Sequence, residues 1–263
     1  MKPYWTAFKL SIIREMAYRF NFAIDFAFDI IGFLVVVVLW KYIFSQTSAI
    51  GGFEYPELIT YYFLILILGT LAARNVSQQM MELVNNGRLS MLVVRPLHAP
   101  VFLMTLQLSV TLMRFVIYVL MAIGIMIFSD SLILPSSTLG FIIFSFSLVL
   151  LFLLNWSFYF LFGCLSFWMT RYGGLLWVVR DLVAFLSGVY FPLSFFSDNI
   201  ESLLRLSPFY YMRNFQAMLY LERVDFAGVV SGFSLQILWI AILLFLAAKC
   251  WKKGMRRYES VGI

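Results

Sequence analysis

The stretch AIDFAFDIIGFLVVVVLWKYIF, residues 23–44, decides the class of this protein. As an α-helix it would be about 33 Å long at 1.5 Å per residue, which is enough to cross the ~30 Å hydrocarbon core of a bilayer. Similar apolar stretches occupy residues 58–76, 101–128, 141–169, 174–192 and 229–248. The sequence therefore predicts an all-α integral membrane protein with six transmembrane helices, built as a single domain of residues 1–263.

The composition supports the same class. Hydrophobic residues make up 63% of the chain and charged residues 12%, whereas soluble domains have roughly 45–50% apolar and about 25% charged residues. A soluble fold could not cover so much apolar surface with so few charges. The six helices leave no room for a large soluble domain, so any soluble machinery must belong to another chain.

Lys and Arg residues are distributed unequally among the predicted connections. Fourteen of the 19 lie in residues 1–22, 74–100, 169–180 and 249–263, and three lie in the connections on the other side. Because basic residues concentrate on the cytoplasmic side of membrane proteins, both ends of the chain are predicted to be cytoplasmic. The net charge of +6 is explained by this orientation and does not indicate a nucleic-acid-binding surface.

Residues 1–22 are predicted to form a helix that lies in the inner membrane interface. Its apolar residues recur at three- and four-residue spacing, with basic residues between them: Trp5, Phe8, Ile12, Met16 and Phe20. An amphipathic basic helix places its apolar side in the acyl boundary and its charges among anionic headgroups. The alternative is an N-terminal extension of the first span.

Signatures of catalysis are missing from the sequence. His98 is the only histidine, so a histidine-rich metal site is excluded, and Cys164 and Cys250 form neither a disulfide framework nor a metal pair. Neither a Gly-x-Ser-x-Gly elbow nor a Gly-x-x-x-x-Gly-Lys-Ser/Thr phosphate loop occurs. The chain is therefore predicted to be neither an enzyme nor an ATP-binding protein by that route.

The connection of residues 77–100 is unusually apolar. Residues 78–96, QQMMELVNNGRLSMLVVRP, predict a short helix, a turn at Asn86-Gly87 and an apolar stretch that Pro96 stops. Exposed apolar residues in a small loop suggest a docking surface; a helix that lies against lipid is the alternative. The candidate contact residues are Glu82, Leu83, Val84, Arg88, Leu89, Leu92, Val93 and Arg95.

Charged residues within spans are costly and suggest function or pairing. Arg114 in the third span would either form a salt bridge or contact a polar or anionic substrate group. Asp25 and Asp29, four residues apart on one helix face, would pair with basic residues or bind a cation. Arg180 and Asp181 could compensate each other at the start of the fifth span. With two membrane aromatics, these residues give the candidate translocation path: Asp25, Asp29, Tyr61, Tyr62, Arg114, Arg180 and Asp181.

Three segments resemble the permeases of type-2 ATP-binding-cassette exporters. Residues 87–96 resemble their G-x-L-x-x-L-L-x-R-P loop, with Val93 in place of the second leucine of the pair. The runs FLSGVYFPL (185–193) and LSPFYY (206–211) look like the exit of the fifth span and the outer-leaflet segment of that family. The tail GMRRYESVG, residues 254–262, is similar to a subfamily that often combines two different permeases with a separate ATPase.

This resemblance implies an architecture and a function. The loop of residues 77–100 would contain a coupling helix, and residues 193–226 would form short re-entrant helices before the last span. Two permeases, different or identical, would face each other over two cytoplasmic ATPase subunits that bind ATP and Mg²⁺, and this chain would bind no cofactor. The cargo would be an amphiphilic, drug-like or lipid-like molecule exported across the inner membrane of a bacterium, between the two permeases.

Two other functions compete with this prediction. An ion-coupled carrier or channel would need a polar pathway at the midplane. The first span offers only two acidic residues for it, and they lie near its cytoplasmic end. A lipid-modifying intramembrane enzyme would need clustered polar catalysts. An ATPase that co-purifies with the chain would favour the exporter over both.

Overall fold

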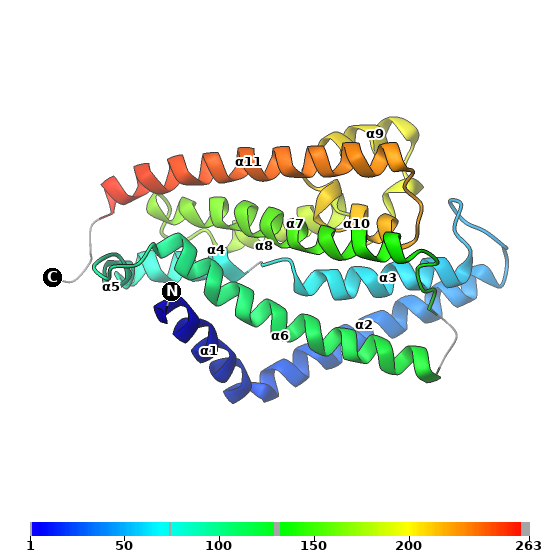
Figure 1. Ribbon diagram of the computed structural model, residues 1–263, viewed down its shortest axis with the longest axis horizontal. Helices are drawn as coiled ribbons and strands as arrows, with labels where there is room; N and C mark the ends of the chain where they lie inside the picture. The colour runs from blue at the N-terminus through cyan, green and yellow to red at the C-terminus, as the bar shows by residue number, and fades with distance from the viewer. Residues whose placement is uncertain (1, 74, 129–131, 259–263) are drawn as a thin grey trace.

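The computed structural model describes residues 2–73, 75–128 and 132–258, and this part of the chain is helical without strands. The helices follow one another in the order labelled in Figure 1. They are α1 (Lys2–Ala17), α2 (Arg19–Phe44), α3 (Tyr55–Thr70), α4 (Asn75–Asn85), α5 (Leu89–Val93), α6 (Ala99–Phe128), α7 (Thr138–Gly163), α8 (Gly173–Leu186), α9 (Asp198–Leu206), α10 (Asn214–Tyr220) and α11 (Phe226–Arg257). Single 3₁₀ turns occupy Cys164–Phe167, Leu193–Phe195 and Tyr210–Met212.

Five helical stretches of the described chain are long and apolar enough to cross a membrane. They comprise α2, α3 together with α4, α6, α7 with the turn that follows it, and α11. The protein is thus an all-helical, multi-pass membrane protein. α8, which corresponds to the predicted fifth span, has only 14 residues, or about 21 Å of helix.

The predicted extent of the fifth span to Pro192 is wrong. α8 ends at Leu186, and Gly188 then adopts the left-handed conformation with φ +81°. A side chain on Gly188 would collide with the Tyr61 hydroxyl and with Asn214, so only glycine fits this turn. The chain leaves the helix here and turns towards α9.

The second predicted span is interrupted. α3 ends at Thr70, and Ala73 has a positive φ of 49° before α4 begins at Asn75. Of the five candidate spans, the one that contains α3 is the most enclosed, and α3 has ten buried residues from Leu58 to Leu68. Its sequence shows no polar face because it is surrounded by other helices: α2, α6 and α10 all pack against it.

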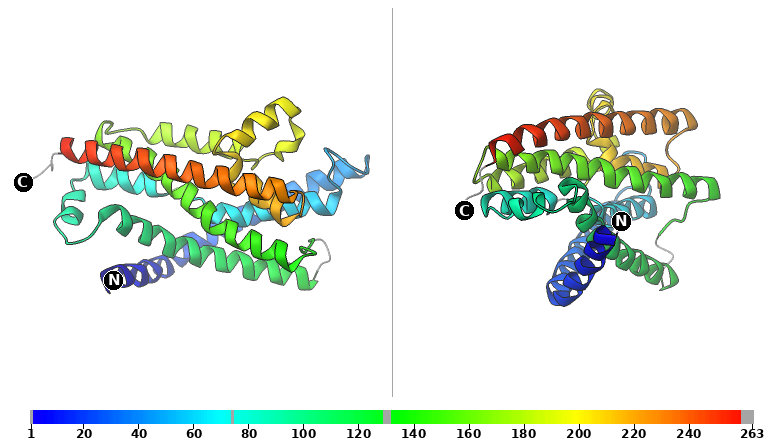
Figure 2. Two further views of the ribbon diagram at one scale, coloured as in Figure 1. Left: turned by 45° about the horizontal axis from the view of Figure 1, so that its top comes forward. Right: turned by 60° about the vertical axis from the view of Figure 1, so that its left-hand side comes forward.

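The elongated molecule has two distinct ends (Figures 1 and 2). The start of α1, α5 and the C-terminal end of α11 lie at one end, called here the α5 end. The loop between α2 and α3 lies at the other, called the α9 end, with α9 set towards it. α1 and α2 meet at a sharp bend at Tyr18, so α1 is a separate helix and not a straight extension of α2. α1 instead runs against α6, where the Ser11 hydroxyl donates to the Leu106 carbonyl at 3.4 Å.

The segment before the last helix is buried, although its sequence is moderately polar. Every residue from Tyr210 to Tyr220 is buried, and α10 packs against α3 and α7. The Tyr61 hydroxyl donates to the Gly188 carbonyl at 2.6 Å and lies 3.0 Å from the Asn214 side-chain oxygen. This bridge fastens the turn after α8 and the start of α10 to the central helix.

Tyr61→Phe should destabilise the fold while leaving its shape unchanged. The substitution removes the hydroxyl and leaves the buried Gly188 carbonyl without this donor, which costs about 1–3 kcal/mol. The measurement is the thermal unfolding midpoint of the protein in detergent, which should fall by several degrees. Tyr42→Phe is the control, since Tyr42 is exposed on α2. Equal midpoints for the two variants would contradict the bridging role of Tyr61.

Candidate functional site

The α5 end carries the helix–turn–helix that the sequence predicts for residues 78–96. α4 ends at Asn85, Gly87 takes the left-handed conformation with φ +68°, and α5 follows from Leu89 to Val93. The Gly87 amide donates to the Val84 carbonyl at 3.2 Å, which closes the turn. Glycine at this position lets the chain reverse without the strain that a side chain would add.

The exposed apolar residues of this segment differ from the predicted set. Leu89 is fully buried, Val84 is buried, and Leu83 and Leu92 pack against the core, so the prediction that these residues are exposed is wrong. The exposed apolar side chains are Met91 at 62%, Val93 at 44% and Val94 at 86%. Together with the exposed Arg88 and Arg95 they form what we call the α5 surface. One side of α5 must cover the core, and the sequence alone did not reveal which side.

Hydrogen bonds hold the α4–α5 segment on two other parts of the chain. The Ser90 amide donates to the Tyr258 hydroxyl at 3.3 Å, and the Asn85 side-chain amide donates to the Thr170 carbonyl at 2.5 Å. The Tyr172 hydroxyl reaches the Ser77 carbonyl at 3.3 Å. Burial raises the pKa of Tyr172 to about 12, so this hydroxyl remains a neutral donor. A displacement of the α4–α5 segment would therefore also displace the α7–α8 connection and the end of α11.

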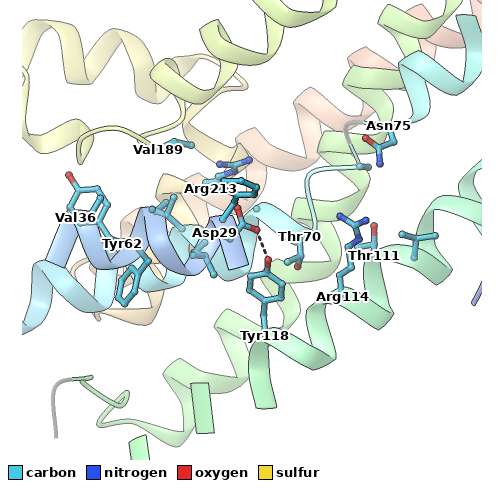
Figure 3. Close-up of a pocket in the computed structure, with 18 of the residues that line it drawn as sticks. Asp29, Val36, Tyr62, Thr70, Asn75, Thr111, Arg114, Tyr118, Val189 and Arg213 are labelled. Carbon is cyan, nitrogen blue, oxygen red and sulfur yellow. Dashed lines mark hydrogen bonds between the residues drawn. The ribbon is translucent and has the colours of Figure 1, made fainter. Parts of the chain in front are cut away.

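A cavity of about 370 Å³ lies between α2, α3 and α6 (Figure 3). We call it the central cavity. Three residues of the predicted translocation path line it: Asp29, Tyr62 and Arg114. The Tyr118 hydroxyl of α6 donates a hydrogen bond to the Asp29 carboxylate of α2 across it. Tyr118 was not identified from the sequence, because a tyrosine in an apolar helix is usually unremarkable.

A second cavity, of about 1000 Å³, adjoins the first towards the α5 end and is lined by α1, α2, α4 and α6. We call it the entry cavity. It contains Asp25, another residue of the predicted path. Both cavities are lined by Asn75, Gln107, Val110 and Arg114. The two hollows therefore follow one another from the α5 end into the middle of the helix bundle.

Arg114 lies where the two cavities meet. Its Nη2 atom is 3.8 Å from the Glu15 carboxylate of α1 and 3.8 Å from the Asp25 carboxylate of α2. The ion pair that the sequence left open for Arg114 is thus present, as is the pairing for Asp25. The guanidinium also lies over the Phe22 ring, 5.6 Å from its centroid. These contacts offset the cost of placing the charge within a span.

Arg213 is a lining residue that the sequence did not reveal. Its position in the sequence predicts an outer connection, but it is 9% exposed and lines the central cavity. Its guanidinium lies against Gly69 near the end of α3, where a Cβ on the glycine would be 3.8 Å from it. An arginine in an irregular segment gives no sequence signal that distinguishes a buried position from a solvated one.

The remaining predicted path residues lie elsewhere. Tyr61 belongs to the core bridge described above. Arg180 and Asp181 are in the middle of α8 and not at its start, and neither is among the described residues that line the two cavities. Arg180 lies over the Trp177 ring at 5.5 Å. Arg74 and residues 259–262, part of the tail on which the resemblance rested, lie outside the described residues.

Comparison with known families gives a match to the ABC-2 family transporter proteins over residues 30–262. The chain belongs to this family. An ABC-2 transporter protein of this kind is a permease, a transport subunit that is not itself catalytic, and membership implies partnership with an ATPase. The search of curated proteins finds no match. The resemblance drawn from residues 87–96 is thereby confirmed at the level of the family.

Proposed function

We propose that this ABC-2 permease exports an amphiphilic, drug-like or lipid-like molecule, and that its path begins in the entry cavity. The observation that carries the proposal is the pair of adjoining cavities, which lead from the α5 end to the bundle interior and share Arg114. Their mixed lining suits a cargo with polar and apolar parts. In this proposal the α5 end faces the cytoplasm of a bacterium and the chain lies in its inner membrane.

The α5 surface is the proposed contact with a cytoplasmic ATPase. Burial of two apolar side chains such as Val93 and Val94 would contribute ~3–6 kcal/mol before association costs. Arg88 and Arg95 supply polar contacts around them. ATP and Mg²⁺ would bind to two ATPase subunits and not to this chain, and their approach on ATP binding would move α5 and the segments bonded to it.

A second permease, identical or different, is proposed to cover α2. This helix exposes a row of apolar side chains: Ile31, Leu34, Val35, Val38 and Leu39. Its other side lines the central cavity through Phe33 and Val36. A second chain across α2 would complete the wall of the path. The buried segment around α10 would be the re-entrant element that limits the path on the α9 side.

Purification of the tagged chain from its native membranes tests this function. The expected result is co-purification of an ATPase that contains a phosphate loop, with ATP hydrolysis in the complex and none by the chain alone. Hydrolysis that remains with the rigorously purified chain, or recovery of the chain without any ATPase, would contradict the proposal. The second outcome would favour an ion-coupled carrier.

A single cysteine at position 6 tests the proposed orientation. Thr6 is exposed on α1, and Ser48 is exposed in the loop between α2 and α3. In a background where Cys164 and Cys250 are replaced by serine, a membrane-impermeant thiol reagent added to intact cells should label Cys at 48 and spare Cys at 6. The reverse pattern would invert the topology. A matching probe at Ser260 falls outside the described residues.

A further inference from the structure

We propose that the central cavity binds the acidic group of an amphiphile, a carboxylate or a phosphate, between Arg114 and Arg213. This inference rests on the proposed function and specifies its cargo. Of the described residues that line this cavity, three carry a charge: Arg114, Arg213 and Asp29. Two guanidinium groups and one carboxylate thus line this cavity, whereas the two further acids near Arg114, Glu15 and Asp25, line the entry cavity on its other side.

The two arginines come from separate parts of the chain and face the same space. Arg114 is on α6, and Arg213 precedes α10 and lies beside Gly69 of α3. In Figure 3 Arg213, Asp29 and Tyr118 occupy the middle of the view, with Arg114 beside them. Guanidinium groups present planar sets of N–H donors that match the oxygens of carboxylate and phosphate.

The guanidinium of Arg114 makes no hydrogen bond to the acidic groups that lie near it. Glu15 and Asp25 both approach Nη2 from the entry cavity at 3.8 Å, which is too long for a hydrogen bond. Among the described residues, the buried Nε atom of Arg114 has no hydrogen-bond partner. The Arg114 side chain is 28% exposed, so an acidic ligand in the cavity would meet the accessible N–H donors of its guanidinium. An incoming oxyanion would thus compete with Glu15 and Asp25 for Arg114.

The rest of the lining is divided into a polar and an apolar side. Asn75 and Thr111 lie with Arg114 on one side of the view, and Val36 and Tyr62 lie on the other (Figure 3). Ile65 and Leu66 of α3 add further apolar lining. This division suits a molecule with a charged head and a hydrocarbon tail, and it does not suit a free inorganic anion.

Competition binding in lipid nanodiscs tests the inference without any ATPase. The probe is dansyl-labelled undecanoic acid, whose fluorescence increases on transfer to an apolar site, with empty nanodiscs as the baseline. Dodecyl phosphate should displace it, whereas dodecylamine and inorganic phosphate at the same concentrations should not. Displacement by dodecylamine at equal concentration would overturn the proposal, and displacement by inorganic phosphate would overturn it in favour of a site for small anions.

Four substitutions connect the binding to these residues. Arg114→Gln and Arg213→Gln should each weaken the binding of dodecyl phosphate at least about tenfold, the value of one charged hydrogen bond. Arg205→Gln is the matched control, because Arg205 is an exposed arginine of α9 that pairs with Glu201. Asp29→Asn should strengthen binding several-fold, since it removes the opposing charge, and a damaged fold would not produce a gain.

Native affinity in both Arg→Gln variants, or weaker binding in Asp29→Asn, would overturn the proposal. If Arg213→Gln does not fold, Arg213→Lys replaces it and should bind dodecyl phosphate more tightly than Arg114→Gln does. A co-purifying ATPase with no binding of the probe would leave the proposed function standing and remove only this inference.

Discussion

Replacing both Val93 and Val94 by aspartate should abolish export and the recovery of the ATPase, while the chain remains folded in the membrane. Both side chains are exposed on the α5 surface, so carboxylates there are hydrated in the free chain and cost the fold little. In the complex the same carboxylates would be buried in an apolar contact without partners. That loss of several kcal/mol corresponds to an affinity reduced by at least about a hundredfold. The measurement is the yield of ATPase in detergent pull-downs together with transport in vesicles.

The matched control for this pair is Leu134→Asp. Leu134 is also exposed and apolar, but it precedes α7 in a loop at the α9 end. The control variant should recover the ATPase at the native yield. Leu89→Asp is a poor test, because Leu89 is fully buried and a charge there would disrupt the fold itself. Native recovery and native export in the Val93/Val94 variant would show that α5 lies against lipid and does not couple.

Gly254→Ala should destabilise the protein strongly, even though alanine favours helices over glycine by about 1 kcal/mol. A Cβ at this position of α11 would overlap the ring of Phe167. That ring is enclosed by the aromatic rings of Trp168, Trp251 and Tyr258, so it has little room to move aside. Overpacking of this kind costs about 3 kcal/mol. The thermal midpoint and the fraction of monodisperse protein in size-exclusion chromatography should both fall.

Gly124→Ala gives the opposite expectation with the same chemical change. Gly124 lies within α6, and a Cβ there would meet nothing within 4 Å. Its helix should therefore gain stability or remain unchanged. A native midpoint for Gly254→Ala would mean that α11 and the Phe167 cluster are not packed as described. The Ser90–Tyr258 hydrogen bond, which depends on that packing, would then lose its support.

The fold was largely predictable because helices that cross a lipid bilayer must be long and apolar. Long apolar runs and the positions of Lys and Arg located most of the helices, and Gly87 and Pro96 framed α5. The break before α4 and the early end of α8 were missed. Both depend on backbone conformations at Ala73 and Gly188 that tertiary contacts impose, and a hydropathy pattern does not register them.

The candidate site was predictable only in part. Charges inside apolar runs are conspicuous, which is why Asp25, Asp29 and Arg114 were identified and now line the cavities. Arg213 was missed because its segment looks like an ordinary outer loop. Its burial results from the packing of α10 against α3 and α7, three elements that are far apart in the sequence.

A salt link at the α9 end further illustrates such long-range contacts. Glu222 accepts hydrogen bonds from the Ser136 hydroxyl and the Ser137 amide, which lower the pKa of its carboxyl group. Arg223 donates to the Glu57 carboxylate at 2.6 Å. These contacts join the connection after α10 to the starts of α7 and α3. Neither partner could have been assigned from spacing, since the residues are separated by 85 or more positions.

ATP-dependent uptake into inside-out membrane vesicles tests the central claim most directly. Vesicles that contain the chain and its co-purifying ATPase are incubated in a medium that contains dansyl-labelled undecanoic acid, a dansyl-labelled alkylamine or a neutral dansyl-labelled alcohol. We expect accumulation that requires ATP, favours the acid and disappears in the Val93/Val94 double aspartate variant. Accumulation of all three probes that is unaffected by ATP, or that follows an imposed ion gradient instead, would contradict it.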